Sequence, residues 1–439
     1  MNTAKKILAA ASAVLAAQFA GAVPVVSNVD MNQSSKTVVI TYTLSGEDAV
    51  VTLDVQTNAN TSAAADDPGW TSIGGAAVSN AKGDVWKKVE TGNRTIRWRP
   101  DQSWPDHVIA AGGARAVVTA WSLGNTPDYM VVDLDAAAQP NTQRYYPAVD
   151  FLPGGLLGNP AYRTTSIVMR KIMAKDVTWT MGSTALEAGR NSAREATHSV
   201  TLTNNYYIGV FEVTQDQWAA IKGSSPAKFV NPAYRAMRPV EYVSYNEIRH
   251  SSSTSDNSAY YYPAAPNPVS FLGQLRAKTG IDFDLPSDAQ WEFAARAGNG
   301  STKWGDGSAI LNTAEDANLS LHGRYKYNGG LVNGTSNPNA GTAGAENGTA
   351  IVGSYAPNSW GVYDMSGNVW ELCLDWHNAD ISSWNGAVAT TSDNGRRIMR
   401  GASWSDDASR CRPAYRFPVT QDDQNYCYGF RLACTAGLQ

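Results

Sequence analysis

The most informative run of this chain lies near its C-terminal end: Gly361-Val362-Tyr363-Asp364-Met365-Ser366-Gly367-Asn368-Val369-Trp370-Glu371. It places a carboxylate, Asp364 or Glu371, at each end of a tight turn that contains Gly367. Calcium takes roughly six to eight oxygen ligands from carboxylates and backbone carbonyls, and short turns supply them readily. We therefore expect a structural calcium ion at this turn. The alternative is that the two carboxylates only cap and hydrogen-bond the turn.

Six further short phrases flank this run in a fixed order. Four precede it: Trp179-Thr180-Met181-Gly182-Ser183, Tyr207-Ile208-Gly209-Val210-Phe211-Glu212-Val213-Thr214, Arg238-Pro239-Val240-Glu241-Tyr242-Val243-Ser244 and Leu285-Pro286-Ser287-Asp288-Ala289-Gln290-Trp291-Glu292. Two follow it: Arg400-Gly401-Ala402-Ser403-Trp404 and Gly429-Phe430-Arg431-Leu432. With these seven phrases in order, residues 167–432 resemble the formylglycine-generating enzyme (sulfatase-modifying factor) family. The resemblance implies an irregular fold related to C-type lectins, in which buried Trp and Arg side chains such as Trp370, Trp404 and Arg431 are architectural.

The resemblance also assigns calcium ligands. Matched position by position, Asp364 and Glu371 would give side-chain oxygens, and Gly367 and Val369 would give backbone carbonyls. A second calcium site of the family begins at an Asn-hydrophobic pair, which Asn318-Leu319 matches here. Its remaining ligands would lie around residues 325–330, where the sequence offers no acidic residue.

The catalytic position departs from the family pattern. The aerobic enzymes that this chain resembles oxidise a sulfatase cysteine to formylglycine with one copper ion, held by two cysteines five residues apart. Here Asp406 takes the first position, Cys411 takes the second, and Ser403 matches a serine that lines that site. Soft thiolates suit Cu(I), and a hard carboxylate suits it poorly. We expect the copper chemistry to be lost; the alternative is an active oxidase that uses Cys411 with Asp406 or with a nearby thiol.

All four cysteines lie in the last part of the chain: Cys373, Cys411, Cys427 and Cys434. An even number of cysteines in an exported protein predicts two disulfides, and the three connectivities cannot be separated from sequence. Cys411 would pair with one of the other three. A zinc site is the alternative, but no Cys-x-x-Cys or His-x-x-x-His spacing supports it.

A polar loop follows the catalytic position and would border the ligand groove of the resembled fold. Acidic and aromatic residues there predict a peptide- or sugar-binding surface, and an ordinary solvated loop is the alternative. The candidate ligand-binding residues are Asp406, Asp407, Arg412, Gln421, Asp422, Asp423 and Tyr426.

The N-terminal part divides into three expected segments. Residues 1–22 have two lysines, an apolar run and Ala20-Gly21-Ala22, which predict a secretory signal peptide and export to the periplasm, cell surface or medium. Short β-branched and aromatic runs predict an all-β, immunoglobulin-like sandwich over residues 23–135. Proline and glycine predict a linker over 136–160. The resulting fold class is α+β, with the sandwich followed by an irregular, loop-rich formylglycine-generating-enzyme-like domain over 161–439.

Composition limits the classes of partner. The 439 residues include 35 Lys+Arg and 39 Asp+Glu, a net charge of −4, so no basic stretch could neutralise a run of phosphates in a nucleic acid. Beyond residue 22 no apolar run approaches the roughly 20 residues needed to span a bilayer. Three helices are expected, at 213–221, 270–276 and 285–298, with Thr214, Ser270 and Ser287 as N-caps.

These observations predict an exported binding scaffold for a peptide or a glycan. The alternative is a working oxidase whose partner is a sulfatase.

Overall fold

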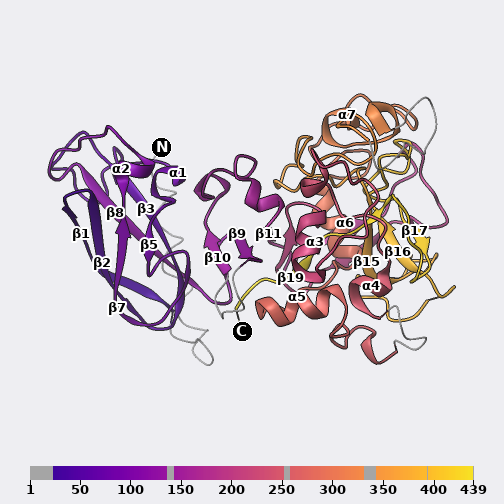
Figure 1. Cartoon of the computed structure of the whole chain (residues 1–439), viewed down its shortest axis with the longest axis horizontal. Helices are drawn as coiled ribbons and strands as arrows, with labels where there is room; N and C mark the ends of the chain where they lie inside the picture. Colours follow the sequence, from indigo (N-terminus) through magenta and orange to yellow (C-terminus); the bar gives the residue numbers. More distant parts are fainter. Residues whose placement is uncertain (1–22, 136–142, 252–257, 331–342, 393, 439) are drawn as a thin grey trace, which may run out of the picture. The chain divides into compact units, whose positions relative to one another are not determined.

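The computed structural model describes residues 23–135, 143–251, 258–330, 343–392 and 394–438, which divide into two compact units (Figure 1). Of the described residues, 23–127, Tyr145–Pro153 and 438 belong to the first unit, and the others up to residue 437 belong to the second. The expected signal peptide, residues 1–22, lies outside the described residues. So do residues 136–142 of the expected linker.

The first unit is built from two β-sheets. One has the strand order β1 (Val25–Ser34), β2 (Thr37–Ser45), β7 (Gly92–Trp98), β5 (Lys82–Gly83); the other has β4 (Thr71–Ser72), β3 (Ala49–Thr57), β6 (Lys87–Val89), with β8 (Ala114–Ser122) also paired to β3. Val38, Ile40, Tyr42 and Leu44 alternate along β2 and are all buried. This alternation is expected of a strand with one face on a core, and it confirms the β-rich N-terminal region. Two short helices, α1 (Gly75–Val78) and α2 (Pro100–Ser103), complete this unit.

The first strand of the second unit is a run that the sequence places in the first module. β9 (Tyr129–Asp133) pairs antiparallel with β11 (Ser166–Ile172), with Val132 opposite Ile167. β11 continues to β14 (Tyr206–Gly209), which pairs with β19 (Ala433–Thr435). The hydrogen-bond partners of β9 thus lie beyond the expected linker and place this strand in the second unit, whereas the expected boundary at residue 135 stays a prediction.

The described part of the expected linker contains regular structure. It holds β10 (Gln143–Tyr146) and the 3-10 turn η1 (Val149–Phe151), and a second turn, η2 (Pro160–Arg163), begins at its last residue.

The rest of the second unit has short elements joined by long loops, as expected of an α+β, loop-rich fold. A hairpin joins β12 (Thr178–Met181) to β13 (His198–Thr201), and a second sheet has the order β17 (Phe417–Val419), β16 (Arg397–Arg400), β15 (Trp370–Trp376), β18 (Tyr428–Gly429). The helical segments are α3 (Gln215–Lys222), η3 (Arg235–Met237), α4 (Tyr245–Arg249), η4 (Ser258–Tyr260), α5 (Phe271–Thr279), α6 (Asp288–Arg296), α7 (Leu319–His322) and η5 (Lys326–Gly330).

The three helices expected from the sequence are present with their N-caps. Thr214, Ser270 and Ser287 each accept a hydrogen bond from a backbone N–H three residues later, and the caps at Thr214 and Ser287 are full capping boxes. A side-chain acceptor at this position satisfies one of the N–H groups that a helix start leaves unpaired. Hydroxyl caps therefore explain why these starts could be predicted.

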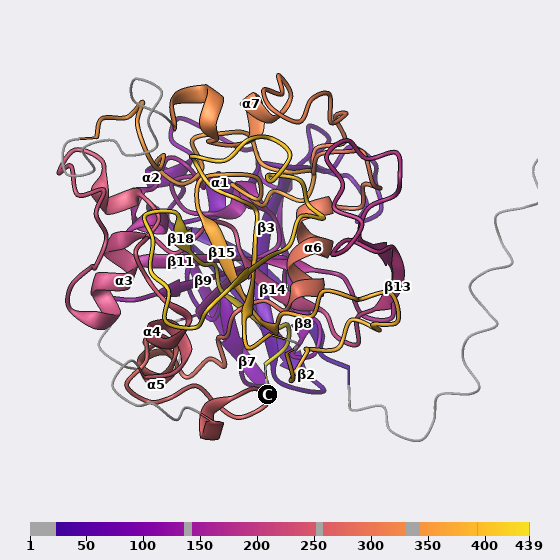
Figure 2. The same cartoon turned by 90° about the vertical axis from the view of Figure 1, so that its right-hand side faces the viewer.

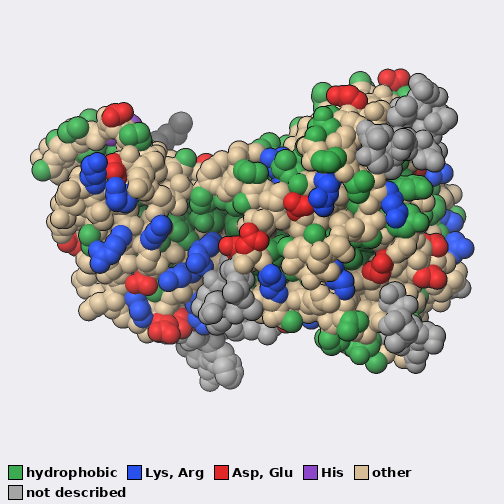
Figure 3. Space-filling view, in the orientation of Figure 1, with side chains coloured by type: hydrophobic (Ala, Val, Ile, Leu, Met, Phe, Trp, Pro, Cys, Tyr) green, Lys and Arg blue, Asp and Glu red, His purple; other side chains and the backbone are tan. Residues whose placement is uncertain are grey.

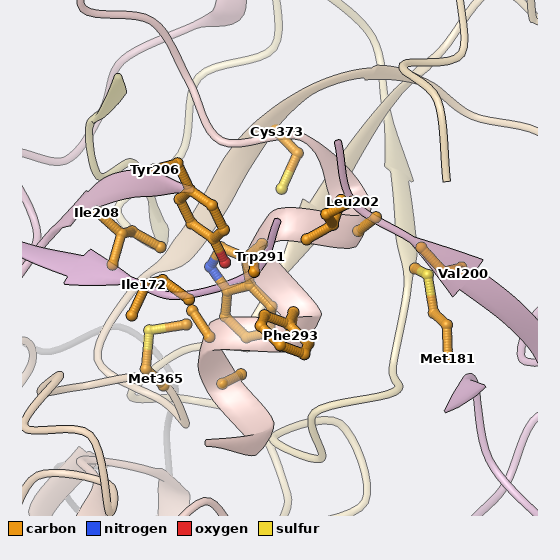
Figure 4. Packing of buried hydrophobic residues seen from close by; sticks show 14 of the residues in the cluster. Ile172, Met181, Val200, Leu202, Tyr206, Ile208, Trp291, Phe293, Met365 and Cys373 are labelled. Atoms are coloured by element: carbon orange, nitrogen blue, oxygen red, sulfur yellow. The ribbon is translucent and has the colours of Figure 1, made fainter. Parts of the chain in front are cut away.

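Helix α6 is the central element of the second unit. It packs against β12, β15 and β16, and Figure 2 shows it beside β15. Trp291 and Phe293 of α6 enter a hydrophobic cluster with Tyr206 and Ile208 of β14 (Figure 4). Helix α6 also carries the buried charged side chains of Asp288, Glu292 and Arg296.

Two carboxylates of α6 share three buried guanidinium groups. Asp288 accepts from Arg400 at 2.5 Å and from Arg416 at 2.8 Å. Glu292 accepts from Arg400 at 2.9 Å and from Arg296 at 2.8 Å. Both carboxyl pKa values lie below their usual range: burial alone would raise them, but the attached arginines outweigh burial. The network joins α6 to β16 and to the segment that enters β17.

All four cysteines are free thiols, so the prediction of two disulfides is wrong. A disulfide needs Cα atoms roughly 4.4–6.8 Å apart, and the four thiols lie in separate surroundings. Cys373 points into the hydrophobic cluster (Figure 4), Cys411 is close to the Asp407 carbonyl, Cys427 packs beside Phe229 and Trp404, and Cys434 lies on β19.

On the face of the second unit shown in Figure 3, acidic and basic side chains are interspersed. Among the described residues, no helix has the length and apolar character needed to cross a membrane.

We predict that Arg400→Leu destabilises the protein by about 3–5 kcal/mol, because it leaves two buried carboxylates short of a partner. Arg235→Leu is the matched control: its ion pair with Asp216 spans 3.6 Å between side chains that are 41% and 36% exposed. That pair is worth less than about 1 kcal/mol. Urea unfolding followed by tryptophan fluorescence measures both, and equal midpoints for the two variants would contradict the role given to the network.

Thiol alkylation tests the cysteine assignments. In native protein at pH 8, iodoacetamide should label Cys427 and Cys434 slowly, because burial raises their pKa values to about 11 and about 12. Cys373 and Cys411 are fully buried and should stay unlabelled until guanidinium unfolds the chain. Peptide mass spectrometry reads the result. Any pair that reacts only after a reductant is added would restore the disulfide hypothesis.

Candidate functional site

The loop after β16 carries Asp406, at the position where the resembled enzymes have the first copper-binding cysteine. It turns sharply at Gly401 and Ala402, whose φ angles are +84° and +62°. The turn brings Ser403 beside Asp406, and both side chains are buried. Ala402 holds a left-handed conformation that a residue with a Cβ rarely adopts, so the local backbone is set by its surroundings.

The Asp406 carboxylate is saturated with hydrogen-bond donors. Oδ2 accepts from Trp370 Nε1 at 2.9 Å, from Ser403 Oγ at 2.5 Å and from the Ser403 N–H at 3.1 Å. Oδ1 accepts from Arg410 at 2.9 Å. A carboxylate with four donors has little capacity left for a metal ion. Asp406 therefore fastens the loop to β15, and Ser403, the expected catalytic serine, is one of its donors.

Cys411, the remaining copper-position cysteine, lies below the surface. It is fully buried, and its thiol is 3.6 Å from the Asp407 carbonyl oxygen. Burial raises the pKa of this thiol well above its usual value, and the carboxylates of Asp406 and Asp407 raise it further. The thiol must lose its proton before it can ligate a metal ion, and its raised pKa makes that loss more costly.

Cys427 is the thiol that sequence reasoning missed. Its Sγ lies 3.3 Å from Ser405 Oγ, and hydrogen bonds from Ser403 and Ser405 partly offset the pKa rise caused by burial. Its position just before Gly429-Phe430-Arg431 is the sequence signal, because β18 runs parallel to β15 and returns the chain to this loop. Among the described residues no group of three or more His, Cys, Asp or Glu side chains is placed to hold a metal ion.

The expected ligand-binding residues differ in how far their side chains are exposed. Asp422, Asp423 and Tyr426 are exposed, and Asp407 reaches Lys326 at 3.2 Å. Gln421 is partly buried and accepts from Arg397 at 3.3 Å.

Arg412 does not belong to a binding surface, and that prediction is wrong. Its guanidinium is fully buried and donates to Glu187 at 2.6 Å and to Glu195 at 2.9 Å. These partners lie more than 200 positions earlier in the chain, so local sequence gave no sign of them.

The expected calcium turn is formed by three residues with left-handed backbone: Asp364, Gly367 and Asn368. Asp364 Oδ2 accepts from the Gly353 N–H at 2.7 Å, whereas its Oδ1 is buried and has no partner among the described residues. Both oxygens of Glu371 are occupied by Arg431 at 2.5 and 2.6 Å. Arg431 is therefore architectural, as expected.

Three buried carboxylates meet near this turn with one arginine. Burial and the charges of Asp364 and Glu371 raise the pKa of Glu212 well above its usual range. Burial also raises the pKa of Asp364, to about 6. One Arg431 against three carboxylates leaves an excess of buried negative charge, which a cation would balance. The unpartnered Oδ1 of Asp364 fits a calcium ion, whereas Arg431 and Trp291 already occupy the oxygens of Glu371.

The second expected calcium pair has a different environment. The Asn318 amide donates to the Ala309 carbonyl at 2.7 Å. The acidic residue of this loop, Asp316, accepts from five N–H groups, including those of Asn318 and Leu319 at 2.9 and 3.0 Å. The Asp316 carboxylate is therefore fully occupied by donors, and the backbone N–H groups of Asn318 and Leu319 help to organise the loop around it. A calcium ion at Asn318 and Leu319 stays a prediction.

Comparison with known proteins matches these features to one family. The family model described as sulfatase-modifying factor enzyme 1-like domain matches residues 166–436. The chain is 29% identical over 246 residues to the chaperone protein LppX of Paenibacillus barcinonensis, covering 52% of this chain and 81% of that one. It is 32% identical over 175 residues to the formylglycine-generating enzyme of Thermomonospora curvata, covering 38% of this chain and 54% of that enzyme.

Two further comparisons complete this set. The inactive C-alpha-formylglycine-generating enzyme 2 of Bos taurus is 31% identical over 161 residues, or 35% of this chain and 44% of that one. The solved structure of PvdO from Pseudomonas aeruginosa aligns at 23% identity with a TM-score of 0.45, over 61% of this chain and 94% of that one. The chain thus spans about half the length of the formylglycine-generating enzyme and of its inactive relative. With the family model matching more than half of the chain, the protein belongs to the sulfatase-modifying factor family.

Proposed function

We propose that the second unit is a binding scaffold without oxidase activity. The observation that carries this proposal is the Asp406 carboxylate, which four donors hold against β15 where the family's copper enzymes place a thiolate. Copper binding there would require those hydrogen bonds to break and the buried Cys411 to ionise. Both steps cost free energy, and the binding of copper to a single soft ligand does not compensate for that cost.

The comparisons support this proposal in a general way. One relative is named an inactive formylglycine-generating enzyme and another a chaperone protein, so the fold is used for roles other than oxidation. Residues 1–22 favour a protein that works after export. We propose a peptide or a glycan as its partner. The remaining candidate activity is a sulfatase-directed oxidase, and Cys427 beside Ser405 is the one nearby thiol that favours it.

A turnover assay separates the two functions. Mature protein is loaded with copper under reducing conditions and given a sulfatase-motif peptide that contains cysteine, with the Thermomonospora curvata enzyme as the positive control. We expect mass spectrometry to find no aldehyde product. Cysteine conversion that is lost in Cys411→Ala or Cys427→Ala, but kept in Cys373→Ala, would overturn the scaffold proposal.

We also propose that calcium binds at Asp364 and stabilises the second unit. When bound, the ion neutralises the excess negative charge of the three buried carboxylates. Asp364 would hold it through a side-chain oxygen, and the turn at Gly367 and Val369 would offer backbone carbonyls.

Calorimetry tests the calcium proposal. Adding millimolar CaCl₂ to chelator-treated protein should raise the unfolding temperature by a few degrees, on the order of 1–2 kcal/mol of added stability. Asp364→Asn should remove this response, because it replaces the charged carboxylate that would bind calcium with a neutral amide. The exposed control Asp423→Asn should keep the response. An equal response in both variants would place the ion elsewhere.

A further inference from the structure

A pocket of about 620 Å³ lies on the second unit, between β19, the residues that lead into β14, the first turn of α6 and the loop 385–388. None of the residues that the sequence predicts to bind a ligand or a metal ion lines this pocket. Its volume is within the roughly 300–1,000 Å³ of pockets that bind small organic ligands. Neither the Asp406 loop nor the expected calcium turn accounts for it.

The charged side chains that line the pocket are already paired. Arg276 donates to Asp282 at 3.3 Å and to Asp284 at 3.2 Å. Asp284 also accepts from the buried Arg249 at 3.0 Å. A charged ligand would have to compete with these ion pairs for a counter-charge, so the pocket favours a neutral ligand.

Uncharged polar side chains of the lining are accessible to a ligand. The exposed hydroxyl and amide side chains are those of Thr201, Thr203, Asn204, Asn385 and Thr435. Such groups both donate and accept hydrogen bonds, as the hydroxyls of a sugar do. The Asn385 side chain is already positioned, because its Oδ1 accepts from the Ala387 N–H at 3.1 Å. Less conformational entropy is therefore lost when its amide N–H₂ donates to a ligand.

The same pocket also offers apolar surface. The Tyr262 ring is 38% exposed, and the buried Leu202 and Leu285 line the pocket as well. A sugar ring has a C–H face that packs on an aromatic ring, while its hydroxyls point toward polar neighbours. A lining that combines one accessible aromatic ring with neutral amides and hydroxyls therefore suits a sugar.

The sheet edge beside the pocket disfavours an extended peptide. β19 has only three residues and pairs with β14 on one side. On its other side Ala433 exchanges both backbone hydrogen bonds with Asp284, each at 2.8 Å. Strand addition needs a row of unpaired backbone N–H and C=O groups. A ligand of this pocket is therefore recognised mainly by side chains, which is how proteins bind glycans.

We propose that this pocket binds a neutral glycan, with one hexose ring against Tyr262 and the ring hydroxyls hydrogen-bonded by Asn385 and the other exposed polar side chains. The assignment rests on the proposed binding role and gives that role a ligand class and a site. The pocket is separate from the Asp406 loop, so its ligand does not depend on what that loop has lost.

Ligand-observed NMR tests the proposal with four neutral disaccharides: cellobiose, maltose, lactose and α-mannobiose. We expect at least one to bind wild type, and its uronic-acid counterpart to bind no more tightly, because the lining cations are already paired. Tyr262→Ala should weaken binding about tenfold, because it removes the stacking face. The matched control Tyr327→Ala removes a tyrosine that is 42% exposed and does not line the pocket, and it should bind like wild type.

Ala387→Trp is a second test that leaves the core untouched. Ala387 is exposed and lines the pocket, so an indole there would fill the space and should abolish binding. Equal unfolding temperatures would show that each variant keeps its fold. Failure of wild type to bind any of the four sugars, equal binding by wild type and Ala387→Trp, or tighter binding of the acidic sugar overturns the proposal. So does an extended peptide that occupies the pocket while the sugars do not.

The cysteine-oxidation assay on the same preparation keeps the two proposals distinct. No aldehyde product together with no sugar binding rejects the glycan and leaves the non-catalytic scaffold standing. An aldehyde product together with sugar binding rejects the scaffold proposal and leaves the glycan site standing.

Discussion

The second unit depends on charge buried between segments that are far apart in the sequence. Its strands are short and its loops long, so few backbone ladders hold it together. Arg400, Arg412, Arg416 and Arg431 each join a late segment to an earlier one through a carboxylate. Removing such a pair from water costs free energy, and removing one partner from the buried pair costs more. Such pairs therefore favour one specific fold without adding much net stability. A fold of this kind has one arrangement in which every buried charge finds a partner.

The requirement that a buried charge find a partner also explains the candidate site. When a carboxylate takes the position of a copper-binding cysteine, it must find donors, and Asp406 finds them in Trp370, Ser403 and Arg410. The loop then becomes part of the framework instead of a reactive surface. Cys411 stays buried beside it, and burial raises the pKa of its thiol, which supports the proposal of a scaffold without oxidase activity.

The exceptions to full pairing are therefore informative. Asp364 has an unpartnered oxygen next to an excess of negative charge, which is the condition that calcium satisfies. Arg238, Glu241 and Arg397 also have buried side-chain atoms without a partner among the described residues, so the charges of the neighbouring carboxylates, and not the missing hydrogen bond alone, distinguish Asp364.

The family, the α+β class, three helices with their N-caps and the absence of the cysteine pair could be predicted from the amino-acid sequence, because they depend on local phrases and on residue identity at fixed spacing. It also marked Arg431 as architectural. Only the tertiary structure decided that the cysteines are unpaired, that Arg412 is buried with Glu187 and Glu195, and that β9 belongs with β11. It alone brought Tyr262 and Asn385 to one pocket. Each of these outcomes depends on contacts between residues far apart in the chain, where burial and the choice of partner fix whether a charge, a thiol or an N–H is occupied or available.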